Sequence, residues 1–248
     1  MKISFFGIGL VIPQYLYSFG KNHSSYGRNE IRCIFKSLVV LGDMFMNIRL
    51  FKECIRALPK NAKVLDAGCG SGNVPRFLKQ MRKDVTIYGI DLEKKVKKDT
   101  PDFVNFFVGS VESMKMFKDS FFDCILCFHV LEHLENPGKA IKEFQRVLKR
   151  KGRLFIESPH WISTIMPIGY NFYDDVTHKR PYTKKTLLML LHDSQLDIKK
   201  IGFDTPIFFY LADLYKINKR SIGYFARKII YLLNMYKTAV WVYAVKKE

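Results

Sequence analysis

Short apolar runs alternate with amphipathic stretches over the central part of the chain, and this pattern predicts its secondary structure. Runs of strand length are expected at residues 63–67, 85–90, 104–108, 122–128 and 153–158. Between these runs, helices are expected at residues 73–82, 93–98 and 137–150, and apolar residues recur at helical spacing over the last of these segments. Strands that alternate with helices are typical of a parallel sheet covered by helices on both faces. We therefore predict an α/β fold for this part of the chain.

The flanking segments extend this pattern at both ends. Further helices are expected at residues 31–40, 43–58 and 183–193, and further strands at 196–202 and 239–245. Pro59 follows one of these helices, and Thr183 is an N-cap residue for another. We divide the chain into an N-terminal helical or cap segment (1–58), a core (59–203), an amphipathic insertion (204–237) and a terminal strand of the core (238–248).

A glycine-rich turn follows the first strand of the core. Residues 63–72 read KVLDAGCGSG, in which an apolar strand leads through Asp66 into glycines at alternate positions. Such glycines let the backbone turn sharply and approach a ligand where a Cβ atom would clash. The next strand, TIYGID, ends on Asp91, and a carboxylate there can accept both hydroxyls of a ribose. The two motifs together indicate a site for a cofactor that contains a nucleoside.

The residues around this turn favour one type of cofactor. A dinucleotide fingerprint would need a third glycine at position 73, where the chain has Asn73. Asp66 would also oppose a pyrophosphate, which prefers helix amides without a nearby negative charge. S-adenosylmethionine (SAM) carries an ammonium, a sulfonium and a ribose diol, and these groups suit both carboxylates. We therefore expect SAM as the cofactor.

A second block supports this interpretation. Residues 122–160 read FDCILCFHVLEHLENPGKAIKEFQRVLKRKGRLFIESPH, which predicts a strand, a helix and another strand in that order. Together with the glycine turn and GID, this block resembles the class I SAM-dependent methyltransferases of the type 11 group. The resemblance covers about residues 60–160. It implies a Rossmann-like, seven-stranded, mostly parallel sheet with helices on both faces, whose last strand inserts antiparallel between its neighbours.

The resemblance also implies roles for individual residues around the cofactor. Residues from Asp66 to Gly72 would wrap the methionine part, Asp91 would bind the ribose, and Leu92 would pack on the adenine. Ser110 and Val111 stand where the family often has an acidic residue beside the adenine amino group, which is a departure from the pattern. The full set expected to bind the cofactor is Asp66, Ala67, Gly68, Gly70, Gly72, Asp91, Leu92, Ser110, Val111, Phe128 and His129.

A third block supplies candidates for catalysis. DDVTHKRPYT, residues 174–183, resembles the D-x-T-H-x-R-x-[FY]-T segment of many type 11 enzymes. Asp175 and His178 could form a carboxylate–imidazole pair in which His178 is the general base for a hydroxyl. Alternatively, Asp175, Thr177 and Arg180 only anchor the loop before the next helix. His160 is a second candidate base, and we predict no metal site.

Charge and cysteine content indicate which partners and which compartment suit the protein. The chain of 248 residues has 41 basic and 23 acidic residues, a net charge of +18. Nucleic acid, anionic lipid and an anionic substrate would all suit this charge, and a solvated basic surface would explain it equally. Cys124 and Cys127 lie in one predicted strand with side chains on opposite faces, so we do not expect a redox or zinc pair. This cysteine usage suggests the cytoplasm.

Two segments outside the core leave membrane contact open. Residues 3–20 carry no charge, but Pro13 and several small residues make them a poor spanning helix, so we expect a cover or interfacial segment. Residues 204–237 contain an apolar stripe surrounded by lysine and arginine. Such a helix lies on an anionic membrane or packs on the domain. We expect both segments and residues 160–182 to roof one pocket at the carboxyl ends of the strands.

The methyl acceptor is not specified by these motifs. We expect a SAM-dependent methyltransferase acting on a hydroxyl of a small-molecule, lipid or glycan acceptor. An RNA-directed enzyme is the alternative suggested by the charge, although the chain has CFHVLEH where amino-nitrogen base methylation usually needs [ND]-P-P-[FYW]. A non-enzymatic scaffold is disfavoured because Asp66, Gly68 and Asp91 are intact. The sequence does not specify an oligomeric state.

Overall fold

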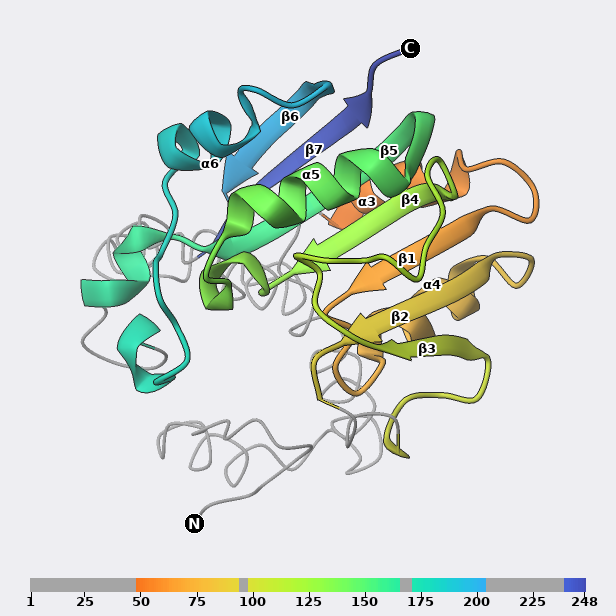
Figure 1. Ribbon diagram of the computed structural model, residues 1–248, viewed down its shortest axis with the longest axis horizontal. Coiled ribbons are helices and arrows are strands. Elements are labelled where there is room, and N and C mark those ends of the chain that lie inside the picture. Colours follow the sequence, from red (N-terminus) through yellow and green to blue (C-terminus); the bar gives the residue numbers. More distant parts are fainter. Residues whose placement is uncertain (1–47, 94–97, 166–170, 204–238) are drawn as a thin grey trace, which may run out of the picture.

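The central sheet of the protein has seven strands and follows the predicted order. The computed structural model describes residues 48–93, 98–165, 171–203 and 239–248 (Figure 1). The elements, in chain order, are α3 (Ile48–Arg56), β1 (Lys63–Ala67), α4 (Asn73–Met81), β2 (Thr86–Asp91), β3 (Val104–Val108), β4 (Phe122–Phe128), η2 (Leu131–His133), α5 (Pro137–Val147), β5 (Leu148–Pro159), η3 (Trp161–Ile165), η4 (Phe172–Asp174), α6 (Lys184–Leu191), β6 (Leu196–Phe203) and β7 (Ala239–Lys246).

The order of the strands confirms the predicted fold class. The strands lie in the order β3-β2-β1-β4-β5-β7-β6. Strands β1 to β5 pair in parallel, and β7 runs antiparallel between β5 and β6. The fold is therefore a Rossmann-like α/β sheet with its last strand inserted antiparallel, as the sequence predicted.

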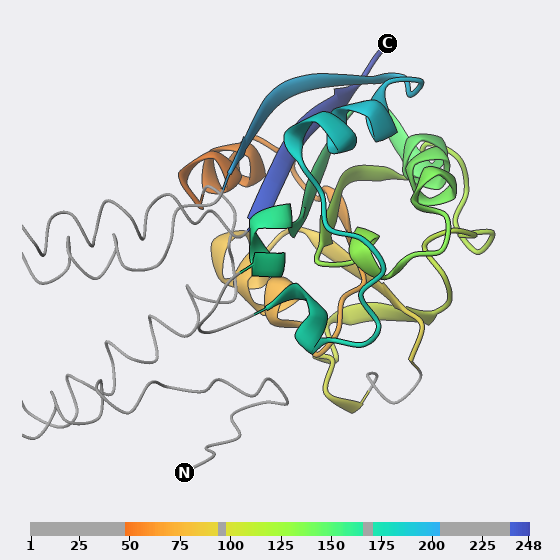
Figure 2. The ribbon, with the colours of Figure 1, turned by 90° about the vertical axis from the view of Figure 1, so that its left-hand side faces the viewer.

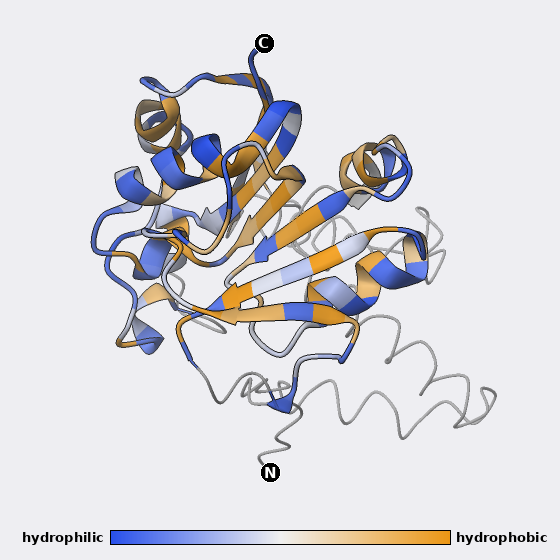
Figure 3. Ribbon diagram, turned by 45° about the vertical axis from the view of Figure 1, so that its right-hand side comes forward, coloured by the Kyte–Doolittle hydropathy of each residue, from blue (hydrophilic) through white to orange (hydrophobic). Residues whose placement is uncertain are grey.

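Helices cover both faces of this sheet. Figure 2 shows α3 and α4 on one side and α5 and α6 on the other. One apolar cluster joins the sheet to α5 and α6 through side chains such as Phe144 and Leu187, and the other joins it to α3 and α4 through Phe51 and Leu78. Cys124 belongs to the α3 side and Cys127 to the α5 side, which confirms that the two thiols face opposite ways. The apolar residues of the strands are visible in Figure 3.

The helix predicted at 137–150 is shorter than expected. It begins at Pro137, where Asn136 accepts a hydrogen bond from the amide of Lys139, and it ends at Val147. Leu148 is extended, fully buried and paired with Phe122 of β4, so β5 starts there and not at residue 153. Pairing and burial of Leu148 outweigh the helical propensity of the basic residues that follow it.

Other predicted boundaries hold within a few residues. Thr183 caps α6, since its hydroxyl accepts a hydrogen bond from the amide of Thr186. Residues 3–20, the helix at 31–40, the insertion 204–237 and most of the short helix at 93–98 lie outside the described residues. Within the described part, no helix has the length and apolar character that crossing a membrane requires.

Arg146 ties the connection between β3 and β4 to helix α5. Its guanidinium donates to Glu143 at 2.8 and 2.9 Å and to the carbonyls of Met114 and Phe117, both at 2.9 Å. Met114 is fully buried and Phe117 is 5% exposed, so the connection is held in the core.

Arg146→Met should therefore destabilise the fold. The methionine keeps an apolar stem but leaves two backbone carbonyls and Glu143 without their charged donor, so we expect a loss of about 2–4 kcal/mol in the free energy of unfolding. Urea denaturation followed by circular dichroism measures this change. Arg150→Met is the control, because Arg150 is exposed and should change stability by less than about 0.5 kcal/mol. Equal effects of the two substitutions would contradict the anchoring role.

Candidate functional site

The candidate site lies where the carboxyl ends of β1, β2 and β4 meet. β1 pairs with β2 on one side and with β4 on the other, so the turn after Ala67 lies between the ends of two neighbouring strands. The amides of Gly68 and Cys69 donate to the carbonyl of Ile90, at 2.8 and 3.1 Å. These bonds fold the turn over the end of β2. Open α/β sheets bind ligands at this edge.

The glycine turn needs its glycines for two different reasons. Gly68 has a φ of +79°, and a Cβ atom there would lie 2.2 Å from Val130 Cγ2. Gly70 has a φ of +45°, but no atom lies within 4 Å of the place a Cβ would take. Gly68 is therefore required by packing, whereas the backbone of Gly70 is open to a neighbouring ligand.

Asp91 is fixed by the turn and points at it. Its Oδ2 accepts a hydrogen bond from the amide of Gly70 at 3.0 Å, and its Oδ1 accepts from the amide of Glu93 at 3.1 Å. Each carboxylate oxygen can accept a further hydrogen bond. Leu92, the next residue, is 67% exposed and offers an apolar surface beside the carboxylate. The pair suits a ribose with a base stacked next to it.

Asp66 presents an acceptor that the described protein does not satisfy. The residue is 2% exposed, and its Oδ2 receives no hydrogen bond from the described residues. Burial, reinforced by the nearby charge of Asp91, raises the pKa of Asp66 to about 8. A buried carboxyl without a donor is costly, and a cationic ligand group would satisfy it.

Residues 109–111 lie beside the end of β2. The amide of Gly109 donates to the carbonyl of Asp91 at 2.9 Å. Ser110 Oγ accepts from the amide of Glu112 at 3.1 Å, and Val111 is 5% exposed within the α5-side core. The turn is therefore close to the candidate site, with Val111 directed largely toward the core.

Phe128 and His129 end β4 on the other side of the turn. The half-buried ring of Phe128 meets Phe51 edge-on, with 6.1 Å between ring centroids. His129 has a φ of +54°, and its ring lies between Glu132 at 3.3 Å and Glu157 at 3.2 Å. Burial opposes a charge on the ring, but these two carboxylates outweigh it and raise the pKa of His129 to about 10.

The two predicted members of the catalytic pair approach one another without a hydrogen bond. His178 Nε2 lies 3.8 Å from Asp175 Oδ2, and the His178 side chain is 4% exposed. Asp175 Oδ1 accepts from the amide and hydroxyl of Thr177, at 2.8 and 2.6 Å, and these bonds lower the pKa of Asp175.

The alternative role of this loop, anchoring the chain before α6, also has contacts. The amide of Lys179 donates to the carbonyl of Glu132 at 2.8 Å, and Arg180 Nη2 donates to the carbonyl of Glu135 at 3.1 Å. His160, the second candidate base, is 5% exposed, and its ring packs edge-on against Phe203 at 4.7 Å. The loop is therefore docked on η2, and His160 is enclosed among aromatic residues.

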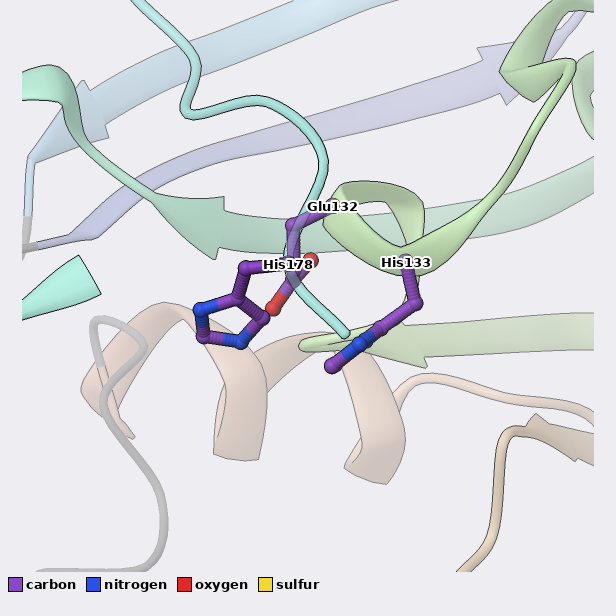
Figure 4. A group of neighbouring side chains, drawn as sticks. All are labelled: Glu132, His133 and His178. Atoms are coloured by element: carbon purple, nitrogen blue, oxygen red, sulfur yellow. The ribbon is translucent and has the colours of Figure 1, made fainter. Parts of the chain in front are cut away.

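Glu132 and His133 were not among the predicted site residues. Glu132 is fully buried and its Oε2 accepts from the hydroxyl of Ser158 at 3.1 Å, while His133 Nδ1 lies 2.8 Å from Thr177 Oγ1. Figure 4 shows the Glu132 carboxylate between the rings of His133 and His178. The available signal was the Glu132–His133 pair between Leu131 and Leu134, directly after the predicted strand.

Comparison with known proteins identifies this domain. Residues 65–156 match the family model described as a methyltransferase domain. The chain carries a class I, type 11 SAM-dependent methyltransferase domain. The matched residues contain both the glycine turn and η2, so the methyltransferase domain includes most of the candidate site.

Curated relatives match this methyltransferase domain at moderate identity. The chain is 28% identical over 149 residues to a ubiquinone biosynthesis O-methyltransferase of Xanthomonas axonopodis, which covers 52% of this chain and 62% of that protein. It is 27% identical over 175 residues to a demethylmenaquinone methyltransferase of Thermotoga maritima, covering 62% of this chain and 76% of that protein. The chain thus spans less than two thirds of the Xanthomonas relative.

A solved structure shares the fold of the methyltransferase domain. A SAM-dependent methyltransferase of Archaeoglobus fulgidus aligns with a TM-score of 0.58 at 25% identity, covering 80% of this chain and 94% of that one. SAM is the cofactor of this family, and the residues of the methyltransferase domain fit it. The unsatisfied Oδ2 of buried Asp66 suits the ammonium, and the open backbone at Gly70 next to Asp91 suits the ribose.

Proposed function

We propose that this protein transfers a methyl group from SAM to a hydroxyl of a small-molecule, lipid or glycan acceptor. The observation that carries the proposal is the pair of carboxylates, Asp66 and Asp91, at the ends of two neighbouring parallel strands with the glycine turn between them. Asp66 is buried and its Oδ2 has no hydrogen-bond donor among the described residues, whereas Asp91 is half-buried and held by loop amides. The two ends of SAM differ in the same way, since the ammonium is a cation and the ribose is a neutral diol.

The residues of the site would divide the cofactor between them. Asp91 would accept the ribose hydroxyls and the exposed Leu92 would cover the adenine, with the backbone of Ser110 and Val111 at the far side. Asp66 and the backbone from Ala67 to Gly72 would enclose the methionine part. Phe128 and His129, at the end of β4, would close the site beneath it.

The bound cofactor supplies an electrophilic methyl on its sulfonium, and the protein supplies orientation and exclusion of water. Alignment of a hydroxyl with that methyl can lower a barrier by about 7–11 kcal/mol. Proton removal from the hydroxyl is the remaining step. His178 is the candidate, with Asp175 near its ring, and His160 is a second one set among aromatic residues.

The hydroxyl acceptor is supported by the name of the Xanthomonas relative, an O-methyltransferase of quinone biosynthesis. The segments that we expect to roof the acceptor pocket lie largely outside the described residues. Membrane contact through the basic insertion and residence in the cytoplasm stay predictions, which flotation with anionic vesicles and cell fractionation would test.

Incubation of the purified chain with methyl-labelled SAM tests the proposal. Phenolic and catecholic quinone precursors, a lipid extract, a glycan extract and total RNA should be offered separately. We expect label in an alkali-stable ether of a hydroxyl acceptor. Asp91→Ala should abolish this labelling, and Asp193→Ala should not, because the Asp193 side chain is 98% exposed after α6. Label found in RNA alone would overturn the acceptor assignment.

A further inference from the structure

Three side chains converge beside the candidate cofactor site, and none of them has a role in the proposed binding of the cofactor. Glu132, His133 and His178 each offer one potential ligand atom, and these atoms all lie within 4.8 Å of one another (Figure 4). Two of the residues come from η2 directly after β4, and His178 comes from the loop before α6. The backbone bond from Lys179 to the carbonyl of Glu132, at 2.8 Å, holds that loop against η2.

The protonation of the His178 ring is determined by its partner. Nδ1 lies 2.6 Å from the backbone carbonyl of Phe172, and a carbonyl can only accept a hydrogen bond. Nδ1 therefore carries a proton, and Nε2 is the nitrogen through which the neutral ring would bind a metal. Phe172 itself is fully buried and stacks on the His178 ring with 4.5 Å between centroids, which orients the ring.

A short relay determines the protonation of His133 in the same way. The hydroxyl of Thr177 donates to Asp175 Oδ1 at 2.6 Å, and this uses its one proton. Thr177 Oγ1 must then accept from His133 Nδ1, which lies 2.8 Å away. The His133 ring is thus also protonated on Nδ1 and would bind a metal through Nε2. Metal-bound histidines commonly donate their other N–H to a carbonyl or other oxygen, as both rings do here.

Glu132 supplies a buried carboxylate to the cluster. It is 0% exposed and Ser158 donates to its Oε2, while its Oε1 accepts no hydrogen bond from the described residues and forms an ion pair with His129 Nδ1 at 3.3 Å. Two buried carboxylates, Glu132 and Glu157, surround the single ring of His129. A cation at Glu132 Oε1 would satisfy this oxygen and balance the second carboxylate.

We propose that Glu132, His133 and His178 bind a divalent first-row metal ion, with Zn²⁺ as the preferred ion. Two imidazoles and one carboxylate are a set that suits Zn²⁺, whereas Mg²⁺ and Ca²⁺ prefer oxygen ligands alone. The potential ligand atoms already lie within 4.8 Å of one another, and metal bonds of about 2.0–2.2 Å would draw them closer together. Three protein ligands leave a coordination position open. The proposal rests on these contacts and not on the methyl-transfer proposal, but it assigns His178 to the metal, which leaves His160 as the candidate base for methyl transfer.

A metal titration of the full chain tests this site directly. Protein stripped with a chelator should be titrated with Zn²⁺ by calorimetry and with Co²⁺ by visible absorption. We expect one ion per chain and the absorption bands of Co²⁺ bound to nitrogen and oxygen. His133→Ala should weaken binding by at least roughly 100-fold. Thr177→Val, which removes the oxygen that orients His133, should weaken it by roughly 10–100-fold.

His192→Ala is the matched control, because the His192 side chain is 83% exposed and lies at the end of α6. It should bind the metal as tightly as the unsubstituted chain. SAM affinity, measured in parallel, should be unchanged in His133→Ala and shows that this variant is folded. Absence of binding at millimolar Zn²⁺, or equal binding by His133→Ala and the unsubstituted chain, would overturn the proposal and leave His178 as the candidate base.

Discussion

Asp91→Ala should weaken SAM binding by roughly 100- to 1000-fold and remove methyl transfer with it. Hydrogen bonds to a charged group contribute about 1.5–3 kcal/mol each, and Asp91 is expected to accept two from the ribose. Loss of about 3–4 kcal/mol corresponds to this range of affinity. The same carboxylate also accepts from the amides of Gly70 and Glu93, so its removal loosens the turn as well as the ribose contact.

Two comparisons separate these contributions. Asp91→Asn keeps one oxygen acceptor and removes the charge, so we expect an intermediate loss of affinity. Asp193→Ala removes an exposed carboxylate elsewhere and should bind SAM normally. Calorimetry with SAM and thermal unfolding of each variant provide the measurements. Normal SAM affinity in folded Asp91→Ala would remove the basis of the proposed cofactor site.

The fold was predictable because its signal is local. The central strands β1 and β4 are apolar runs buried on both faces, and every strand from β1 to β5 was found from the sequence. The error at 148–150 has the opposite cause. Basic residues there continue the helical pattern of α5, and only the pairing of Leu148 with Phe122, distant in the sequence, ends the helix. Local propensity gives no information about that pairing.

The residues of the candidate site were likewise predictable only where their sequence signal is local. Motifs at the ends of strands identify Asp66 and Asp91, and the parallel topology brings the two residues together. No motif identifies the cluster around Glu132, because its members are far apart in the chain: His133 and Thr177 are separated by 44 residues. From the sequence we predicted no metal site, and we did not expect Cys124 and Cys127 to form a zinc pair. Orientation of both rings by Phe172 and Thr177 requires the folded loop and has no counterpart in the sequence pattern.

SAM affinity should depend on pH through Asp66, with a maximum near pH 8. The carboxyl is ordinarily ionised at neutral pH, but burial and Asp91 raise the pKa of Asp66 to about 8 in the folded protein. Below that pH the ligand-free carboxyl is protonated and must release its proton to pair with the ammonium. An α-amino group itself loses its proton at about pH 8. Affinity should therefore fall on both sides of the maximum.

The decrease in SAM affinity below pH 8 comes from a group of the protein, Asp66, and not from SAM. Between pH 8 and pH 6 the ionised fraction of Asp66 falls roughly 50-fold while the protonated fraction of the ammonium about doubles, so affinity should drop by roughly 25-fold, with proton release on binding increasing as the pH falls. Asp66→Asn should lose this acid side and keep the alkaline side, at a lower maximal affinity. Calorimetry in buffers of different ionisation enthalpy counts the released proton. An identical acid side in Asp66→Asn would assign the titration to another group.

The stability of the ligand-free protein gives a second, independent measure of the raised pKa of Asp66. Because folding raises the pKa of Asp66 above its unfolded value near 3.9, the residue contributes stability that is full below that pH and is lost as pH rises through about 8. The unsubstituted chain should lose stability relative to Asp66→Asn between pH 5 and pH 9, and saturating SAM should reduce this loss. A purely structural role would be served better by asparagine, because asparagine gives up no stability as the pH rises. A carboxyl that lowers the stability of the ligand-free fold is therefore explained by its interaction with the cofactor.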